Sequence, residues 1–100
     1  MIIYIDIDDT ILETPNMEYE KSVPIKERIE KINKLYDKGH TIIYWTARGS
    51  GSGKDWSELT KEQFKLYGIK HHGLKFGKPV YDIFIDDKNI NSEDFFKSNA

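Results

Sequence analysis

Four short runs of apolar residues, separated by longer polar stretches, are spaced along the chain. Ile2–Ile5 and Thr41–Trp45 are β-branched and aromatic on both faces, which predicts two buried strands, the first of them in the centre of a sheet. Leu74–Phe76 predicts a short third strand and Ile83–Ile85 a fourth. Strands that are apolar on both faces are typical of parallel sheets.

The stretches between these strands have the spacing of helices. Pro24 suits the first turn of one helix and Gly39 its end. The apolar face of this helix has intervals of four, three and three positions and consists of Ile25, Ile29, Ile32 and Leu35. Asp55 and Glu58 resemble a capping box for a second helix, which ends at Gly68. The predicted inner face of this second helix consists of Trp56, Leu59, Gln63, Leu66 and Tyr67.

The remaining segments complete an α/β pattern. Glu13–Ser22 is polar and predicts a loop, and a last short helix, capped by Asn91 or Ser92, carries two phenylalanines. The order strand, helix, strand, helix, strand, strand predicts an α/β fold with a mainly parallel sheet, in a single domain over residues 1–100. In such sheets ligands bind beyond the carboxyl ends of the strands.

Composition narrows the classes of function. Hydrophobic residues make up 38% of the chain and charged residues 32%, which is typical of a globular protein and not of a disordered one. The net charge of -2 gives no strong field that would attract nucleic acid or an anionic membrane. The longest apolar run is too short to cross a bilayer and the first residues carry no signal sequence, so we expect a cytoplasmic protein. The absence of cysteine excludes thiolate chemistry.

Carboxylates gather directly after two of the predicted strands. Asp6, Asp8 and Asp9 follow the first strand, and Asp86 and Asp87 follow the fourth. Three carboxylates within four positions repel one another, and a bound cation removes that cost. Oxygen ligands without cysteine or a chelating histidine pair favour a hard cation such as Mg²⁺. One such cluster is equally typical of a solvated acidic turn, but two clusters that each close an apolar strand favour a metal site.

These residues carry a resemblance to a known family. Asp6–Thr10, with the sequence DIDDT, resembles the DxDxT motif of the haloacid dehalogenase-like hydrolases. Thr46 resembles the second motif of that family, Lys78 the lysine of the third, and the pair Asp86 and Asp87 the acidic fourth motif, all in the family's order. The resemblance implies a three-layer Rossmann-like fold. Neither interval in which the family inserts a cap is long enough to hold a cap domain.

The resemblance also implies a role for each residue. Asp6 would attack phosphorus and form an aspartyl-phosphate, while Asp8 would act as acid and then base, with its backbone carbonyl on Mg²⁺. Lys78 would balance the negative charge of the nucleophile and the phosphate. Two further sets are expected. The metal set is Asp6, Asp8, Asp86 and Asp87. The phosphate-binding set is Thr46, Ala47, Arg48 and Lys78; for Arg48 a surface salt bridge is the equal alternative.

The predicted activity is therefore magnesium-dependent hydrolysis of phosphate monoesters. The chain also resembles small proteins of bacterial capsule and polysaccharide biosynthesis loci, which implies a phosphosugar substrate. A nucleic-acid 3′-phosphatase and a phospho-accepting regulatory module are the alternatives. Without a cap the site should be open unless Glu13–Ser22 or a second subunit of a homo-oligomer covers it. The glycine-rich run Gly49–Gly53 fails the P-loop pattern, since Asp55 follows Lys54 where serine or threonine is required, and it predicts a flexible loop near the site.

Overall fold

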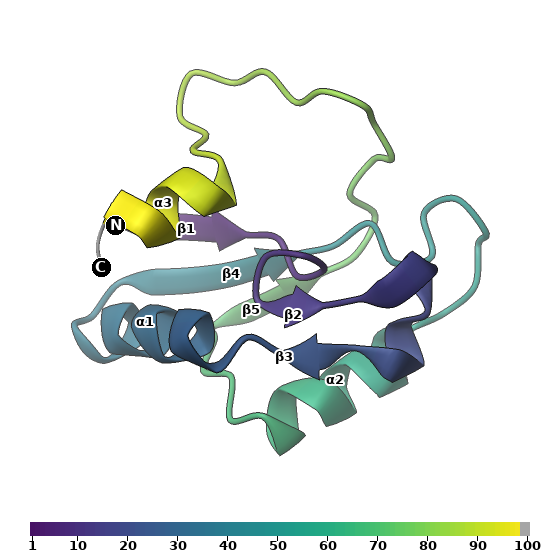
Figure 1. Cartoon of the computed structure of the whole chain (residues 1–100), viewed down its shortest axis with the longest axis horizontal. Helices are drawn as coiled ribbons and strands as arrows, with labels where there is room; N and C mark the ends of the chain where they lie inside the picture. Colours follow the sequence, from purple (N-terminus) through teal and green to yellow (C-terminus); the bar gives the residue numbers. More distant parts are fainter. Residues whose placement is uncertain (99–100) are drawn as a thin grey trace.

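A three-stranded parallel sheet forms the centre of the protein (Figure 1). The structure, a computed structural model, describes residues 1–98. The strands are β1 (Ile2–Ile5), β4 (Thr41–Trp45) and β5 (Gly73–Lys75), in the order β1-β4-β5. The parallel sheet and its first three strands are thus confirmed. The central strand is β4, however, and the expectation that β1 is central is wrong, because no described strand pairs with the second edge of β1.

Two helices cover one face of this sheet, α1 (Lys26–Asp37) and α2 (Ser57–Leu66). Burial in β4 alternates along the strand, and Ile42 and Tyr44 point into the core beneath the helices. The other buried hydrophobic members of this core are Ile5, Ile7, Ile11, Leu12, Ile29, Ile32, Phe64 and Ile69. The first helix begins after the position predicted for it, because Pro24 belongs to a strand. Its predicted end at Gly39 is confirmed by the positive φ of 96° there.

The chain between β1 and α1 makes an excursion that begins and ends in a small antiparallel pair, β2 (Leu12–Glu13) and β3 (Val23–Pro24). Two 3₁₀ turns, Pro15–Met17 and Tyr19–Lys21, occupy the loop between them. The segment predicted as a loop therefore consists of two 3₁₀ turns, and the β2–β3 pair closes it at its base. It brings the chain back beside β2, and α1 begins just after β3.

The short helix α3 (Ser92–Ser98) closes the described chain and confirms the predicted last helix. The Asn91 side chain caps it by accepting a hydrogen bond from the backbone N–H of Glu93 at 2.9 Å. The guanidinium of Arg28 on α1 lies 4.7 Å from the ring centre of Phe96, and its Nη2 lies 3.0 Å from Glu93 Oε1. These contacts hold α3 against α1.

A third layer is not present in residues 1–98. Ile2 and Tyr4, which β1 directs away from the helices, are 70% and 51% exposed. In the described part of the chain α1 and α2 pack on one face and α3 packs on α1, so the three-layer arrangement stays a prediction. No cap domain is formed by these residues either. No helix among them is long and apolar enough to cross a membrane.

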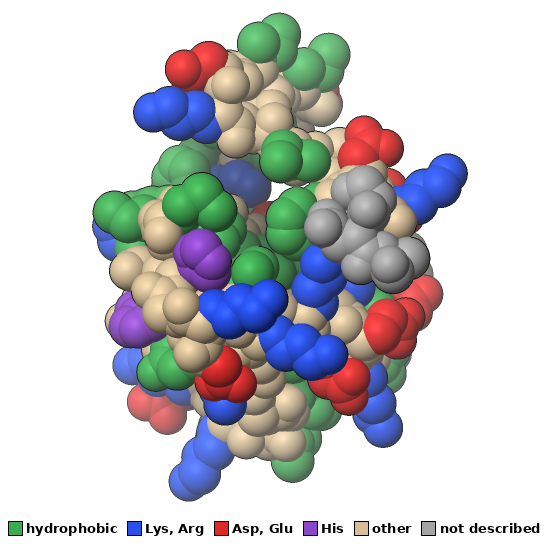
Figure 2. All heavy atoms as spheres, turned by 90° about the vertical axis from the view of Figure 1, so that its left-hand side faces the viewer, with side chains coloured by type: hydrophobic (Ala, Val, Ile, Leu, Met, Phe, Trp, Pro, Cys, Tyr) green, Lys and Arg blue, Asp and Glu red, His purple; other side chains and the backbone are tan. Residues whose placement is uncertain are grey.

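The prediction of a fourth strand at Ile83–Ile85 is wrong. These three residues are 77%, 42% and 91% exposed and belong to no strand. The segment between β5 and α3 arches away from the sheet, and it stands as a knob with hydrophobic side chains on its surface (Figures 1 and 2). Local contacts replace strand pairing: the Phe84 ring lies 5.2 Å from the ring of Tyr81, and Asn89 donates a hydrogen bond to the carbonyl of Phe84.

Candidate functional site

The carboxyl ends of the three parallel strands bring distant polar residues together. Asp6 directly follows β1 and Thr46 directly follows β4. The backbone N–H of Thr46 donates to the carbonyl of Lys75 at 2.9 Å, and the N–H of Lys78 donates back to the carbonyl of Thr46 at 3.1 Å. This backbone pairing carries the lysine to the first strand, where Lys78 Nζ lies 3.7 Å from Asp6 Oδ1. The predicted convergence of Asp6 and Lys78 is present.

Asp6 is the carboxylate that faces open space at this edge of the sheet. Its side chain is 38% exposed. Burial of the rest of the group raises the pKa of Asp6, and the neighbouring charge of Asp8 acts in the same direction, while the ammonium of Lys78 and the N–H of Ile7 oppose both. A carboxylate whose charge is incompletely solvated reacts readily with an electrophile or a cation, provided that the pH keeps it ionised.

Lys78 is held among aromatic rings. Its ammonium lies 5.3 Å from the ring centre of Tyr81 and 6.0 Å from those of Trp45 and Phe84. Its side chain is only 13% exposed. Cation–π attraction and the pairing with Asp6 together fix one positive charge where the three strands end.

A cleft of about 690 Å³ opens beside this pair. Asp6, Ala47 and Lys78 line it at the strand ends. Its other walls come from the excursion before β3, the glycine-rich loop and the segment after Lys78, and consist of Met17, Tyr19, Gly49, Gly51, Ser52, Trp56, Pro79, Val80 and Tyr81. The excursion thus forms one side of the site through Met17 and Tyr19, which is one of the two ways of covering it that the sequence left open. The volume suits a small organic ligand.

Asp8 points away from this cleft into an ion pair. Arg48 Nη2 donates to Asp8 Oδ1 at 2.7 Å and Arg48 Nε donates to Oδ2 at 3.0 Å. The hydroxyl of Thr14 donates to the same Oδ1 at 2.6 Å. The Arg48 side chain has no exposed surface, so neither predicted role, a phosphate contact or a surface salt bridge, fits its place in the structure. Both oxygens of Asp8 are occupied as acceptors.

The remaining donors of Arg48 are satisfied by α2 and by Ser22, whose hydroxyl accepts from Nη2 at 3.4 Å. Its Nη1 donates to Gln63 Oε1 at 2.7 Å and to Thr60 Oγ1 at 3.0 Å, and the ring of Tyr19 lies 4.8 Å from its Cζ. Sequence reasoning missed this network. The signal was Gln63, a polar residue on a predicted apolar helix face, because a buried amide there requires a polar partner.

Thr46 lies beneath the cleft and not on its surface. Its side chain is buried, and its hydroxyl accepts a hydrogen bond from the backbone N–H of Arg48 at 3.1 Å. The predicted phosphate-binding segment is therefore divided: Ala47 reaches the cleft, Thr46 shapes the turn below it, and Arg48 turns to Asp8.

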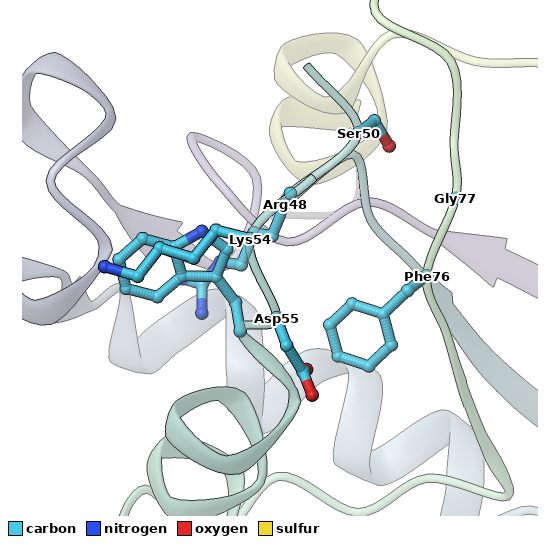
Figure 3. A pocket seen from close by; sticks show the side chains of 8 residues that line it. Arg48, Ser50, Lys54, Asp55, Phe76 and Gly77 are labelled. Carbon is cyan, nitrogen blue, oxygen red and sulfur yellow. The ribbon is translucent and has the colours of Figure 1, made fainter. Parts of the chain in front are cut away.

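The glycine-rich loop is tied to the site by hydrogen bonds and is not an open linker. The N–H of Gly53 donates to the carbonyl of Gly49 at 2.7 Å, and the hydroxyl of Ser50 donates to the carbonyl of Lys78 at 2.7 Å. The loop also forms part of a smaller pocket of about 190 Å³, where the ring of Phe76 projects toward Asp55 (Figure 3). The hydrogen bond from Ser50 connects this loop directly to Lys78, the lysine that pairs with Asp6.

The predicted magnesium ligands are not assembled in one place. Among residues 1–98, no three side chains of aspartate, glutamate, histidine or cysteine form a group that could hold a metal ion. Asp86 and Asp87 are exposed on the arch, where a hydrogen bond between the two carboxyls lowers the pKa of Asp86 and raises the pKa of Asp87. The side chain of Asp8 is taken by Arg48. Asp6 alone offers a carboxylate to the cleft, so this arrangement does not fit the expected ligand set.

Comparisons with known proteins support the fold but give no information on the reaction or its residues. No family model and no curated protein matches the chain. A crystal structure of a structural-genomics target from Vibrio cholerae is similar over 95% of this chain and 86% of that one, with a TM-score of 0.84 and 21% identity. At that identity the likeness establishes a shared fold only.

Proposed function

We propose that the chain is a phosphomonoester hydrolase with a fold of the haloacid dehalogenase-like type, that Asp6 is its nucleophile, and that a small phosphosugar is its substrate. The observation that carries this proposal is the pairing of Asp6 with Lys78 at the mouth of a cleft of about 690 Å³. The motif order described above and the position of both residues at strand ends support it.

The pair supplies the two features that phosphoryl transfer requires. An oxygen of Asp6 attacks phosphorus, the bond from phosphorus to the ester oxygen breaks, and the released alcohol takes up a proton. Water then attacks phosphorus and releases inorganic phosphate, which restores the carboxylate. The ammonium of Lys78, fixed 3.7 Å from Asp6 before substrate arrives, offsets the negative charge that gathers on the phosphoryl oxygens.

Asp8 has a more constrained part in this proposal. Its expected role as acid and base requires an oxygen that is free to carry a proton, yet both oxygens accept hydrogen bonds from Arg48. Proton delivery by Asp8 would require this ion pair to open. Magnesium dependence remains a prediction. Of the expected ligand set, only Asp6 offers its carboxylate to the cleft in this arrangement.

A screen of phosphate monoesters, with and without Mg²⁺, tests the function, and Asp6→Asn is the control. We expect turnover by the native chain and loss of at least about a thousandfold in Asp6→Asn, because the amide cannot form the phosphoenzyme. Equal turnover by both proteins would exclude this mechanism. Turnover that does not change when Mg²⁺ is replaced by EDTA would remove the metal from the proposal.

The same screen separates the alternative functions. Salt-sensitive hydrolysis of 3′-phosphorylated oligonucleotides would favour the nucleic-acid phosphatase, although Lys78 is the one cation that lines the described cleft. A stable phosphoenzyme without turnover would favour the regulatory module. A homo-oligomer that covers the cleft and a cytoplasmic location both remain predictions, which sedimentation and cell fractionation test.

A further inference from the structure

The walls of the cleft beyond the Asp6–Lys78 pair are apolar and aromatic. Trp56 and Tyr81 contribute rings from two separate segments. Met17 and Val80 stand beside them and are 71% and 67% exposed, although both are apolar. Apolar side chains gathered around a reactive pair commonly mark the place of a ligand's apolar part.

Tyr81 connects this apolar surface to the reacting atoms. Its ring lies 5.3 Å from Lys78 Nζ, and the residue is 44% exposed. A group attached to a phosphate that contacts Lys78 would therefore pass over or beside the Tyr81 ring. Trp56, the other aromatic ring of the wall, is held by an edge-to-face contact with Tyr19, with ring centres 5.0 Å apart.

Charge in the cleft matches a single phosphate. Among its lining residues Lys78 is the one cation and Asp6 the one anion. Arg48 is buried against Asp8 and has no exposed side-chain surface. Lys54 is engaged over the Trp56 ring, 4.4 Å from its centre. Beyond Lys78 no described cation lines the cleft, so a second phosphate would have to draw Lys54 away from the Trp56 ring or stay unpaired, and desolvating it there would be unfavourable.

Resting on the proposed function, we propose that the cleft holds the leaving group of the ester, and that this group is uncharged and has a flat apolar face that packs on Tyr81 and Trp56. Aryl rings and sugar rings share this chemistry, because the axial C–H groups of a sugar make one of its faces apolar. Bisphosphates, nucleoside diphosphates and oligonucleotide ends are excluded by the same reasoning.

Three esters with one kind of leaving alcohol test this inference: propyl phosphate, 3-phenylpropyl phosphate and propane-1,3-diyl bisphosphate. The alcohols are primary and of similar acidity, so differences in kcat/KM report on the cleft. We expect about a tenfold preference for the phenylpropyl ester over the propyl ester, and the bisphosphate to react most slowly. Glucose 6-phosphate against sorbitol 6-phosphate, ring against open chain, tests the sugar source in the same way. Whichever comparison gives the larger preference, aryl against propyl or sugar ring against open chain, identifies the class of leaving group that the cleft accepts.

Variants of Tyr81 test whether this preference comes from the aromatic wall of the cleft. Tyr81→Ala should bring the phenylpropyl-to-propyl ratio close to one, while Tyr81→Phe should keep it. Any effect of Tyr81 on Lys78 acts on both esters and cancels in the ratio. Leu66→Ala is the matched control, since Leu66 is 75% exposed on α2 and does not line the cleft. A ratio of one in the native protein, a ratio that Tyr81→Ala leaves unchanged, or a preference for the bisphosphate would overturn the inference.

Binding of non-hydrolysable phosphonates separates this inference from the proposed function. Quenching of tryptophan fluorescence gives Kd for 3-phenylpropylphosphonate and propylphosphonate. If no ester is hydrolysed but the phenylpropyl compound binds about tenfold more tightly and Tyr81→Ala removes the difference, the subsite stands and the phosphatase proposal fails. Equal binding of both compounds without hydrolysis would reject the two together.

Discussion

The guanidinium of Arg48 and the carboxylate of Asp8, 40 positions apart in the chain, form a two-point ion pair at 2.7 Å and 3.0 Å. Arg48 is the interior partner, with no exposed side-chain surface, while Asp8 keeps 22% of its side chain exposed at the edge of the site. The pair connects the turn after β1 to the loop after β4, and through Thr60 and Gln63 it also connects both to α2.

Removing one member of this pair should destabilise the protein strongly. Arg48→Met leaves the Asp8 carboxylate without its partner in a poorly solvated place, and we expect the free energy of unfolding to fall by about 3–5 kcal/mol. Arg48→Lys should recover only part of the loss, because an ammonium cannot reproduce the two-point geometry. Urea denaturation followed by circular dichroism measures each value.

A double-mutant cycle identifies the cause. Asp8→Asn combined with Arg48→Met should cost clearly less than the sum of the two single changes, because neither charge is then left alone. The exposed pair of Lys70 with Asp37, at 2.8 Å, is the comparison, and Lys70→Met there should cost less than about 1 kcal/mol. Additive losses at Asp8 and Arg48 would show that the pair itself contributes nothing.

The sequence predicted the parts of the site that depend on strand ends. Asp6 could be placed because it follows an apolar run and parallel strands end at one edge, while Lys78 was assigned to the same site by the resemblance of its segment to the third motif of the family. The partner of Asp8 could not be predicted in this way. Arg48 follows a strand just as a phosphate ligand would, and its burial depends on Thr60 and Gln63 of a helix whose orientation no local pattern determines.

The fourth strand shows a different limit. Ile83–Ile85 has the composition of a strand, but a strand also needs an edge to pair with, and that is a property of the whole fold. In the structure Phe84 packs on Tyr81, and no strand within residues 1–98 pairs with the outer edge of β1. For the same reason the position of Asp86 and Asp87 could not be obtained from the run that precedes them.

The stability of the protein should depend on pH through Asp6. Its pKa is raised in the folded state, so above about pH 4, the unfolded pKa, and until the folded carboxyl has itself ionised, the folded protein binds more protons than the unfolded chain, and the free energy of unfolding falls as the pH rises. Asp6→Asn removes this unfavourable ionisation. We therefore expect Asp6→Asn to be more stable than the native protein at pH 7 in EDTA, with a difference that vanishes below about pH 4.

Asp55 provides a control of opposite sign for this prediction. Hydrogen bonds from Ser57, one of them from its N–H at 2.9 Å, lower the pKa of Asp55. Its ionised form therefore adds stability above the unfolded pKa, and this contribution is lost as the pH falls. Asp55→Asn should be slightly less stable than the native protein at pH 7. Thermal melts of the three proteins from pH 3 to pH 8 compare the slopes, and parallel curves for native protein and Asp6→Asn would contradict the prediction.

The hydroxyl of Tyr44 is a buried polar group without a partner among the described residues. The side chain has no exposed surface, the Phe64 ring packs edge-on at 5.0 Å, and burial raises the pKa of the phenol. Tyr44→Phe should stabilise the protein by about 1 kcal/mol, because the unsatisfied hydroxyl is removed and the ring contact stays. Tyr67→Phe, which loses a hydrogen bond to the Ser22 carbonyl, should instead cost roughly 0.5–1 kcal/mol. Denaturation midpoints give both signs.

Gly49 is the glycine that the site cannot replace. Its φ of 83° is in the left-handed region, and a Cβ on it would overlap the carbonyl oxygen of Lys54, a backbone atom of the same loop. Gly49→Ala should therefore cost about 2–3 kcal/mol. Because the loop is bonded to Lys78 through Ser50, we also expect kcat to fall by about tenfold or more.

Two other glycines separate the causes of that loss. Gly53 has a φ of 74° but open space where a Cβ would stand, so Gly53→Ala should cost only the backbone strain, about 1 kcal/mol. Gly51 has no positive φ, and a Cβ there would make an ordinary contact with Val80 at 3.9 Å, so Gly51→Ala should stay within about 0.5 kcal/mol of the native protein. Equal losses in Gly49→Ala and Gly53→Ala would mean that the overlap with Lys54 relaxes freely. The loop would then be pliable, and its hydrogen bond could not hold Lys78 against Asp6.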